Sequence, residues 1–349
     1  MRAVLGILRL PCALLAAVAL AGAAAPLAAF SQGVLAAPAA PAPSATALSP
    51  PAPAAITDAP RPPRPEDRLL ACPTTRDYVG RVVATVMLNG KGPFRFIVDT
   101  GANDSTVSPQ LASVLGLAPS VGRSLRIAGV TGTAIVPSVP IESLRAGALV
   151  IEHSEVPVIW SPVMTGADGI LGAAGLAQDT LLVDFRHNTV VIRPADAAAI
   201  PPGYTRVQAR RLASGLLSVP GEVGGVPADA IIDTGSPQTL GKLALFRALY
   251  SRPGAGDRAK VYGITKQVRP GNLQIAPTVD LGAIRIGNAA LVFGDFPIFK
   301  VWGLTDHPAI ILGMDVLGTV DAVSIDFRHA EIGVAPQEYD LTERIPLTG

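Results

Sequence analysis

Two aspartates in this chain each end an apolar run of the kind that forms a buried strand. Asp99 follows residues 96–98, which are Phe-Ile-Val, and Asp233 follows residues 230–232, which are Ala-Ile-Ile. The apolar, mostly β-branched runs predict strands that are buried on both faces. A carboxylate at the end of such a strand is costly unless it is hydrogen-bonded, charge-paired or protonated. Because each acid lies in one copy of a repeated unit, we expect the two acids to meet.

Two carboxylates in contact can perform acid–base chemistry. At a separation of about 3 Å they cannot both ionise, so they share one proton and titrate as a unit. Such a pair can hold a water molecule, take its proton as a general base, and protonate a leaving amine as a general acid. This chemistry needs neither a metal nor a cofactor, and we expect none, because the four histidines are scattered without the spacing of metal ligands.

The residues that follow the two acids are also the same in both copies. Thr100 and Gly101 follow Asp99, and Thr234 and Gly235 follow Asp233. A glycine at this position lets the backbone come close to the carboxylate and offer it an N–H. The sequence therefore predicts two matching loops, each with its acid held by its own backbone.

The elements around Asp99 can be predicted in chain order. Residues 82–88 form an apolar run, Asn89-Gly90 is a hairpin turn signal, and residues 94–99 return as a second strand. After the acid, Ser108-Pro109 has the form of a helix N-cap and first position, and Gly116 would end that helix. We expect folded structure to begin near Tyr78.

The second half of the chain repeats these features in the same order. The spacing between matching features widens from the first pair (Asp99 and Asp233) to the last (Asp184 and Asp326) without reversing, as in a tandem duplication with small insertions. Most of the insertion follows Gly263, so the second of two matching hairpins should be the longer. The other matching segments, most of them predicted as strand pieces, are 129–131 with 263–265, 144–147 with 284–287, 156–159 with 296–299, and 170–172 with 311–313.

A second pair of aspartates also recurs. Asp184 begins the sequence Asp-Phe-Arg-His that ends at His187, and Asp326 begins the same sequence, which ends at His329. Each lies between a strand and its return, where a short acid commonly hydrogen-bonds the backbone of a turn. We therefore predict a structural role in hairpins for these two acids.

A duplicated β unit with Asp-Thr-Gly after a buried strand and an apolar-apolar-Gly sequence further along resembles the aspartic peptidases. The resemblance is closest to the retropepsin-like branch, here with both lobes on one chain, and it covers roughly residues 78–334. It implies a mostly β acid-protease fold, in which two duplicated β-lobes are related by a pseudo-twofold axis and enclose a central cleft. It also implies that Asp99 and Asp233 are catalytic.

The same resemblance implies roles for the neighbouring residues. Thr100 and Thr234 would hydrogen-bond across the pseudo-twofold, with Gly101 and Gly235 supporting the active site. Residues 170–172 and 311–313 would thread behind the two loops. The residues expected to bind substrate, from the first loop and from two flap-like hairpins over the cleft, are Ala102, Asn103, Asp104, Gly129, Val130, Thr131, Gly263, Ile264 and Thr265.

Length and composition limit the possible classes of protein. The chain has 349 residues, a formal net charge of +1 and 16% charged residues, so it presents no basic face for nucleic acid. The expected parts are a signal peptide or N-terminal anchor at 1–36, a flexible Pro/Ala-rich linker at 37–74, an N-terminal lobe at 75–200, a C-terminal lobe at 201–340, and a tail at 341–349.

The N-terminal segment predicts export. Arg2 and Arg9 precede an apolar run at residues 10–29, with small residues suited to signal cleavage. The protein is then expected to be periplasmic or extracellular. It would contact a membrane only if the segment is left uncut, because the run is also long enough to span a bilayer.

The function predicted from these features is that of an aspartic endopeptidase, acting as a monomer on extended polypeptides. The alternative is a protease-like, non-catalytic peptide-binding protein of the cell envelope. Two departures from the family pattern favour this alternative: Asn103 stands where retropepsins often carry an acid, and Ser236-Pro237 follows the second Asp-Thr-Gly in place of alanine.

Overall fold

The computed structural model describes residues 71–77, 79–119, 123–195, 200–250, 257–305 and 307–336. All of them belong to one compact unit, Asp58–Gly349. The predicted signal peptide or anchor, the linker up to residue 70 and the tail lie outside the described residues. Within the described ranges, no helix has the length and apolar character needed to cross a membrane.

The first half of the described chain is built mainly of strands. Its elements are β1 (Ala71–Arg76), β2 (Val82–Leu88), β3 (Lys91–Val98), β4 (Thr106–Val107), α1 (Pro109–Leu115), β5 (Ser124–Gly129), β6 (Gly132–Ala146), β7 (Leu149–Pro157), the 3-10 helix η3 (Pro162–Met164), β8 (Gly169–Leu171), the 3-10 helix η4 (Ala173–Leu176), β9 (Asp179–Asp184) and β10 (Thr189–Pro194).

The second half repeats this succession. Its elements are β11 (Thr205–Gln208), β12 (Arg210–Arg211), β13 (Leu217–Val223), β14 (Val226–Ile232), β15 (Leu240–Lys242), α2 (Leu243–Leu249), β16 (Asp257–Tyr262), β17 (Val268–Leu281), β18 (Ile284–Gly294), α3 (Ile298–Val301), β19 (Ala309–Leu312), α4 (Met314–Leu317), β20 (Ala322–Asp326) and β21 (Glu331–Ala335).

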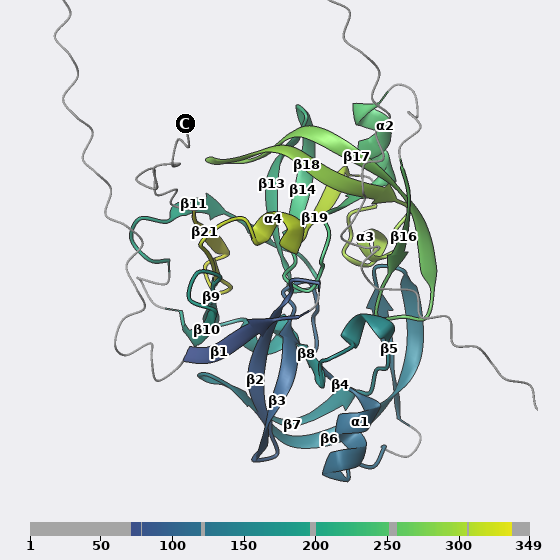
Figure 1. The fold of residues 1–349 in the computed structure, drawn as a ribbon, viewed down its shortest axis with the longest axis vertical. Helices are drawn as coiled ribbons and strands as arrows, with labels where there is room; N and C mark the ends of the chain where they lie inside the picture. The colour runs from purple at the N-terminus through teal and green to yellow at the C-terminus, as the bar shows by residue number, and fades with distance from the viewer. Residues whose placement is uncertain are drawn as a thin grey trace, which may run out of the picture. The chain divides into compact units, whose positions relative to one another are not determined.

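These elements form two β-rich lobes with matching strand pairings (Figure 1). In the first lobe, β2 and β3 form an antiparallel hairpin and β8 pairs with β3 in parallel. In the second lobe, β13 and β14 form the hairpin and β19 pairs with β14 in parallel. The mostly β, duplicated fold predicted from the sequence is confirmed.

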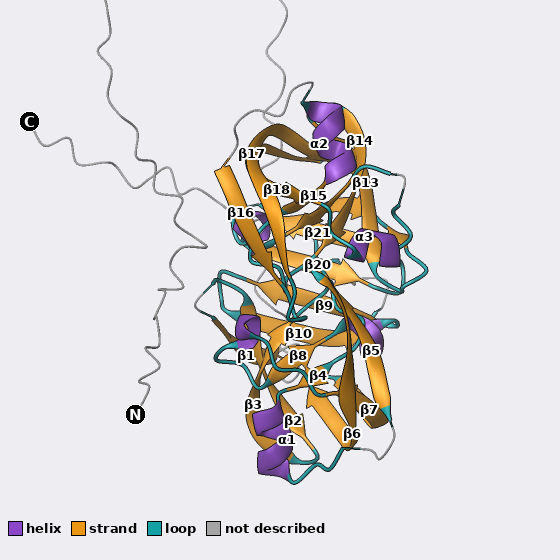
Figure 2. Cartoon of the chain, turned by 90° about the vertical axis from the view of Figure 1, so that its right-hand side faces the viewer, coloured by secondary structure: helices purple, strands orange, loops and turns teal. Residues whose placement is uncertain are grey.

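A shared sheet joins the two lobes. Strand β9 of the first half pairs antiparallel with β20 of the second, with Val183 opposite Val323. Strands β10 and β1 extend this sheet on one side, and β21 and β11 extend it on the other. Figure 2 shows β9, β10 and β20 between the two lobes. The exchange of backbone hydrogen bonds between halves fixes one edge of the lobe junction.

The repeated Asp-Phe-Arg-His sequences lie at the ends of β9 and β20. The Asp184 carboxylate accepts the backbone N–H of His187 at 2.8 Å and contacts its ring Nδ1 at 2.8 Å. Asp326 makes the same two contacts with His329, at 2.9 and 2.7 Å. The predicted structural role of these acids in hairpins is confirmed.

Helix α1 follows the Asp99 loop and the short strand β4, and it has the predicted ends. The Ser108 hydroxyl accepts the N–H of Leu111 at 3.1 Å, Pro109 occupies the first helical position, and Gly116 ends the helix at a φ of 70°. Leu111 and Ala112 are buried on the inner face. The cap, the proline and the terminal glycine therefore act as the local sequence predicted.

Two expectations differ from the structure. Strand β1 begins at Ala71, within the end of the predicted linker and before Tyr78, because it pairs with both β10 and β2. Residues 296–299 enter helix α3 instead of a strand, because Pro297 adopts a helical conformation that starts the turn. The second of the two matching hairpins is the longer, as predicted, because its connecting loop spans 263–267 whereas that of the first spans 130–131. The predicted lobe boundary between residues 200 and 201 stays a prediction.

Candidate active site

Each predicted catalytic aspartate follows a strand that pairs with the Ile-Leu-Gly strand of its own lobe. Asp99 follows β3, and its N–H donates to the Leu171 carbonyl of β8 at 3.0 Å. Asp233 follows β14, and its N–H donates to the Leu312 carbonyl of β19 at 3.0 Å. The two acids therefore occupy the same place in two copies of one unit.

The glycines that directly follow β8 and β19, Gly172 and Gly313, let these segments pass behind the two acid loops. A Cβ on Gly172 would lie 2.6 Å from the backbone of Asp104, and one on Gly313 would lie 2.5 Å from that of Gln238. The N–H groups of these glycines donate to hydroxyls of the loops, from Gly172 to Ser105 and from Gly313 to Thr239, both at 3.1 Å. The threading implied by the family resemblance is present in both copies.

Sequence reasoning missed the two hydroxyl residues, Ser105 and Thr239. A signal was available, because the interval along the chain from 105 to 239 equals the interval from 99 to 233 that separates the two acids. Thr239 is further held by Asp315, whose carboxylate accepts its N–H at 2.9 Å and its hydroxyl at 2.7 Å.

Thr100 and Thr234 lock the two loops together across the lobe junction. The Thr100 hydroxyl donates to the Ile232 carbonyl at 2.7 Å and accepts the Thr234 N–H at 3.1 Å. The Thr234 hydroxyl donates to the Val98 carbonyl at 2.6 Å and accepts the Thr100 N–H at 3.2 Å. Both threonines are buried, with exposed fractions of 5% and 0%. These four bonds are the cross-lobe contact that the family resemblance implies.

The glycines after the threonines lie against the opposite acid. A Cβ on Gly101 would be 2.5 Å from Asp233 Cγ, and a Cβ on Gly235 would be 2.2 Å from Asp99 Cγ. No larger residue fits at either position without moving a carboxyl group. The structure therefore brings Asp99 and Asp233 together, each facing the other's loop.

Backbone N–H groups hold each carboxylate from its own loop, as predicted. Gly101 donates to Asp99 Oδ1 at 2.9 Å, and Gly235 donates to Asp233 Oδ1 at 2.8 Å. The second loop adds the N–H of Ser236, which donates to the same Asp233 oxygen at 3.0 Å. The replacement of alanine by Ser236 therefore leaves the acid well supported.

Burial and mutual proximity change the acidity of the pair. The pKa of Asp233 is raised well above its ordinary value by burial, by the charge of Asp99 and by a hydrogen bond between the two carboxyls. Burial also raises the pKa of Asp99, while the hydrogen bond from Asp233, the Gly101 N–H and the charge of Arg81 act to lower it. One proton shared between two buried carboxyls is the state these directions describe.

The three residues after the first Asp-Thr-Gly lie in different surroundings. Ala102 packs against a cluster of apolar residues in the first lobe. The Asn103 side chain donates to the Ser214 carbonyl of the second lobe. Asp104 is exposed and lines a separate cavity, whose wall also includes Glu155. Their roles in substrate binding stay predictions.

The two predicted flap-like hairpins contact each other at their tips. The hydroxyls of Thr131 and Thr265 form a hydrogen bond of 2.7 Å, and both threonines are buried. Arg269 adds a bond from its Nε to the Thr131 carbonyl at 2.9 Å. A Cβ on Gly129 would lie 2.7 Å from Ile264 Cγ1, so the tips also pack closely.

The tip of the second hairpin, residues 263–265, also contacts the first lobe. The Ser161 hydroxyl donates to the Gly263 carbonyl at 2.8 Å, and Gly263 itself lies close to Val130, since its Cβ would be 3.0 Å from the valine side chain. Ile264 packs on the apolar cluster that includes Ile97 and Ile159. The sequence did not predict these contacts.

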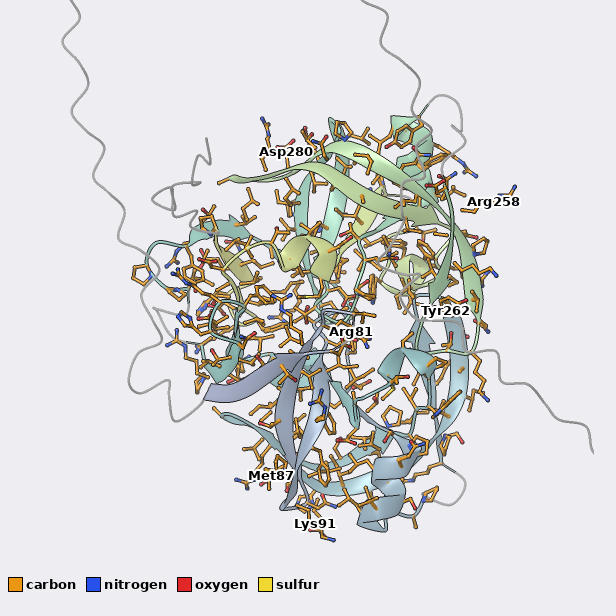
Figure 3. The ribbon with its side chains drawn as sticks, viewed as in Figure 1. Arg81, Met87, Lys91, Arg258, Tyr262 and Asp280 are labelled. Atoms are coloured by element: carbon orange, nitrogen blue, oxygen red, sulfur yellow. The ribbon has the colours of Figure 1, made fainter. Side chains whose placement is uncertain are left out.

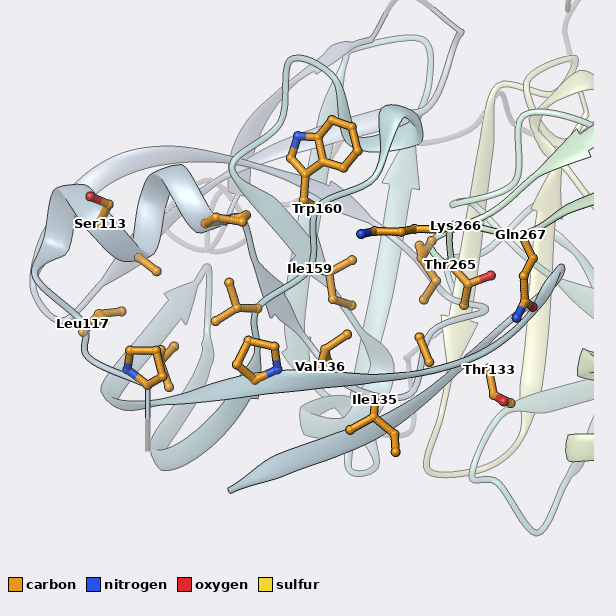
Figure 4. A pocket seen from close by; sticks show the side chains of 18 residues that line it. Ser113, Leu117, Thr133, Ile135, Val136, Ile159, Trp160, Thr265, Lys266 and Gln267 are labelled. Atoms are coloured by element: carbon orange, nitrogen blue, oxygen red, sulfur yellow. The ribbon is translucent and has the colours of Figure 1, made fainter. Parts of the chain in front are cut away.

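A pocket of about 820 Å³ lies in the first lobe between α1, β6 and the second tip. Its walls include Val136, Ile159 and Trp160 of the first lobe together with Ile264 and Lys266 of the second (Figure 4). Ile159 belongs to the apolar cluster against which Ala102 packs, and Val136 and Ile264 pack against the same cluster. The pocket therefore adjoins the side chains that flank the Asp99 loop.

The described residues contain no group of three or more His, Cys, Asp or Glu side chains placed to hold a metal ion. Each copy of the repeated unit contributes one aspartate, the loop that supports it and one hairpin tip. Of these, the pair of carboxyls is what general acid–base chemistry on a bound water requires.

Comparison with known families agrees with this geometry. A family model described as "Aspartyl protease" matches residues 84–174 and 219–316. The chain belongs to the aspartyl protease family. Each matched region holds one Asp-Thr-Gly and one Ile-Leu-Gly sequence, and the lobes have the duplicated acid-protease fold. A search of curated proteins finds no match.

We predict that Thr100→Val will lower the free energy of unfolding by about 2 to 6 kcal/mol. The change leaves the buried Ile232 carbonyl and Thr234 N–H without partners, and each unsatisfied group costs about 1–3 kcal/mol. Urea unfolding measures the effect. Thr100→Ser keeps the hydroxyl and should recover most of the loss, while Thr85→Val on the exposed side of β2 should change little. Equal stability of Thr100→Val and the unaltered protein would contradict the proposed lock.

We also predict that the free energy of unfolding of Asp233→Asn will increase, relative to that of the unaltered protein, as the pH rises above about 4. In that range the unfolded chain has lost the proton of Asp233, while the folded chain retains it because the pKa is raised. The folded state then binds more protons than the unfolded state, so its stability falls with rising pH. Unfolding in urea at pH values from about 3.5 to 7 tests this, and a pH-independent difference would contradict it.

Proposed function

We propose that this protein is an aspartic endopeptidase that hydrolyses peptide bonds of extended polypeptides. The observation that carries the proposal is the pair of aspartates, each facing the other's loop and held by the lock of Thr100 and Thr234. Membership of the aspartyl protease family supports protease activity in general.

The pair supplies both halves of the reaction. A water held between the carboxyls loses a proton to the ionised acid as its oxygen attacks the peptide carbonyl carbon. The protonated acid gives its proton to the carbonyl oxygen, where negative charge develops. When the C–N bond then breaks, the proton taken from water passes to the leaving nitrogen. The proton on the carbonyl-derived hydroxyl returns to the second acid, so the pair ends in its starting state.

The hairpin tips would close over a bound peptide. Because Thr131 and Thr265 are bonded to each other, a polypeptide reaches the acids only when the tips separate or when its ends thread beneath them. Strand-like pairing with the tips would hold the peptide extended, and closure would exclude water from the reacting carboxyls.

The pocket beside the second tip supports a preference for apolar side chains. Its wall is largely aliphatic, with Trp160 at one side, and no aspartate or glutamate occurs among the described residues that line it. A large apolar residue of the substrate would bury surface there that is otherwise exposed to water. Trp160 itself is 58% exposed, so it has surface to contribute.

We further propose that the enzyme acts outside the cytoplasm, as a monomer. The basic and apolar N-terminal segment supports export, and the presence of both acids on one chain means that the catalytic pair needs no second copy. A membrane contact would be limited to that N-terminal segment.

Replacing either catalytic acid should abolish cleavage. Asp99→Asn and Asp233→Asn each remove a group that must carry or accept a proton, so we expect kcat/KM to fall by at least about a thousandfold. The measurement is digestion of a peptide library across pH, with circular dichroism to verify folding. Asp168→Asn, outside the acid pair, is the matched control.

An inhibitor of aspartic peptidases such as pepstatin extends this test. Inhibitor-sensitive cleavage by the unaltered protein excludes the pure peptide-binding alternative. Peptide binding with no turnover at any pH would instead support that alternative and reject the endopeptidase proposal. Full activity in either asparagine variant would reject the acid pair as the catalytic group.

Trp160→Ala should weaken selection for large apolar side chains. Loss of the indole removes a wall of the pocket, which should raise KM for peptides bearing such a residue by about tenfold, equivalent to ~1.4 kcal/mol. Steady-state kinetics on paired peptides with leucine or alanine at the selected position measure the change. Val114→Ala, an exposed apolar residue of α1 that does not line the pocket, is the control. An unchanged leucine preference in Trp160→Ala would contradict a substrate role for the pocket.

A further inference from the structure

One segment precedes the β2–β3 hairpin in the first lobe, and its counterpart precedes the β13–β14 hairpin in the second. The two segments make the same backbone hydrogen bond but carry different side chains. In the first lobe, the N–H of Asp77 donates to the Arg81 carbonyl at 3.0 Å. In the second lobe, the N–H of Leu212 donates to the Leu216 carbonyl at 2.8 Å. Arg81 and Leu216 are therefore counterparts in the duplication.

The strand register places these counterparts beside the two acids. Val83 and Ile97 form the last pair of the β2–β3 ladder, and continuing this register by two residues would put Arg81 opposite Asp99, in agreement with the effect of the Arg81 charge on that carboxyl. The corresponding pair in β13–β14 is Ser218 with Ile231, and it puts Leu216 opposite Asp233. Residues opposite each other in an antiparallel pair project on the same face, with Cβ atoms about 4.5–5.5 Å apart.

The family match supports the same correspondence. Its two regions begin at residues 84 and 219, and the interval between these two starting points equals the interval from Arg81 to Leu216. A cation and an aliphatic side chain thus occupy one position of the repeated unit.

Arg81 is held in place as a buried ion pair. Its side chain is 5% exposed and that of its partner Asp77 is 4% exposed. Arg81 Nε donates to Asp77 Oδ2 at 2.8 Å, the Arg81 N–H donates to Oδ1 at 2.9 Å, and the guanidinium also donates to the Val163 carbonyl. Figure 3 labels Arg81 where the two lobes meet.

Leu216 belongs to the apolar core, with an exposed fraction of 1%, and Leu212 packs against the same core. The second acid therefore has no cation at the position where the first acid has one.

We propose that Arg81 is a positioning residue that keeps the negative charge on Asp99 and the shared proton on Asp233. On this proposal Asp99 is the general base that takes the proton of the attacking water. Asp233 is the general acid that protonates the carbonyl oxygen. This assignment rests on the proposed function, because it divides the two roles of the peptidase pair between named residues.

The charges acting on the pair agree with this division. The groups that influence Asp99 are its partner Asp233 and the cation of Arg81, with Asp77 behind the latter. For Asp233 the charge that acts from the described residues is that of Asp99, and it raises the pKa of Asp233 further above that of an ordinary carboxyl. An attractive charge on one side and none on the other breaks the symmetry that two identical loops would otherwise impose on the proton.

The test is a ¹³C NMR titration of the full chain labelled at the aspartate carboxyl carbons, with Asp99→Asn and Asp233→Asn used to assign the two signals. In the unaltered protein we expect Asp99 to show the chemical shift of an ionised carboxyl and Asp233 that of a protonated one, between the two transitions of the pair. Arg81→Met should raise the lower transition by about one pH unit and make the two shifts more alike. Arg81→Lys should recover part of both effects.

A control and a second variant keep the test decisive. Arg95→Met removes an exposed cation of neighbouring β3 and should leave the transitions in place. Asp77→Asn removes the counter-charge of Arg81 while keeping one of the two oxygens that accept its hydrogen bonds, so it should move the lower transition to lower pH. This opposite shift serves as the test if Arg81→Met does not fold. Unchanged transitions in folded Arg81→Met or, failing that, in Asp77→Asn would overturn the proposal.

The titration also separates this proposal from the proposed function. It requires no turnover, so a protein that cleaves no peptide can still show the predicted proton placement. Where cleavage is observed, the acid limb of the kcat/KM profile should move with the lower NMR transition in each variant. A profile that stays fixed while the NMR transition moves would reject Asp99 as the general base.

Discussion

The structure depends on the four hydrogen bonds that Thr100 and Thr234 make across the lobe junction. Bringing two carboxyl groups together out of water is unfavourable, because burial and mutual repulsion both oppose the ionised forms. The threonine hydroxyls satisfy the backbone of the opposite loop in a site from which water is largely excluded. The bonded carbonyls belong to Val98 and Ile232, the residues directly before the two acids. These hydrogen bonds therefore fix the backbone immediately next to each acid.

Two other connections limit how the lobes can move around that lock. The shared sheet joins β9 to β20 by a continuous ladder, whereas the hairpin tips meet through single side chains, chiefly Thr131, Thr265 and Ser161. A ladder of backbone bonds opens only with loss of several bonds together, but a few side-chain bonds can break singly. The acids are therefore held by connections that are harder to break than those between the hairpin tips.

Much of this architecture is predictable because its signals are local. The Ser108 cap, the Asn89-Gly90 turn and the apolar run before each acid depend on neighbours in sequence, and duplication allowed each feature to be checked against a second copy. The ordered match of 170–172 with 311–313 likewise indicated the supporting strands. Two acids in equivalent positions were enough to predict that they meet.

The remaining features depend on contacts that a linear pattern does not encode. Ser161 reaches Gly263, and Asn103 reaches Ser214, each across a long stretch of intervening chain. Residues 296–299 have apolar character that suits a strand, yet burial of Phe299 and Trp302 against each other follows from a short helix. Arg81 was missed because an arginine before a strand is ordinarily a surface residue, and only the register shows which acid it faces.

The linkage of both lobes in one chain has an evolutionary consequence. In a homodimer every substitution appears twice, so a cation introduced beside one acid would also appear beside the other, and the pair would remain symmetric. Here a single codon change can act on one half alone, as the arginine and leucine at equivalent positions illustrate. Duplication followed by fusion thus allows natural selection to specialise each half separately.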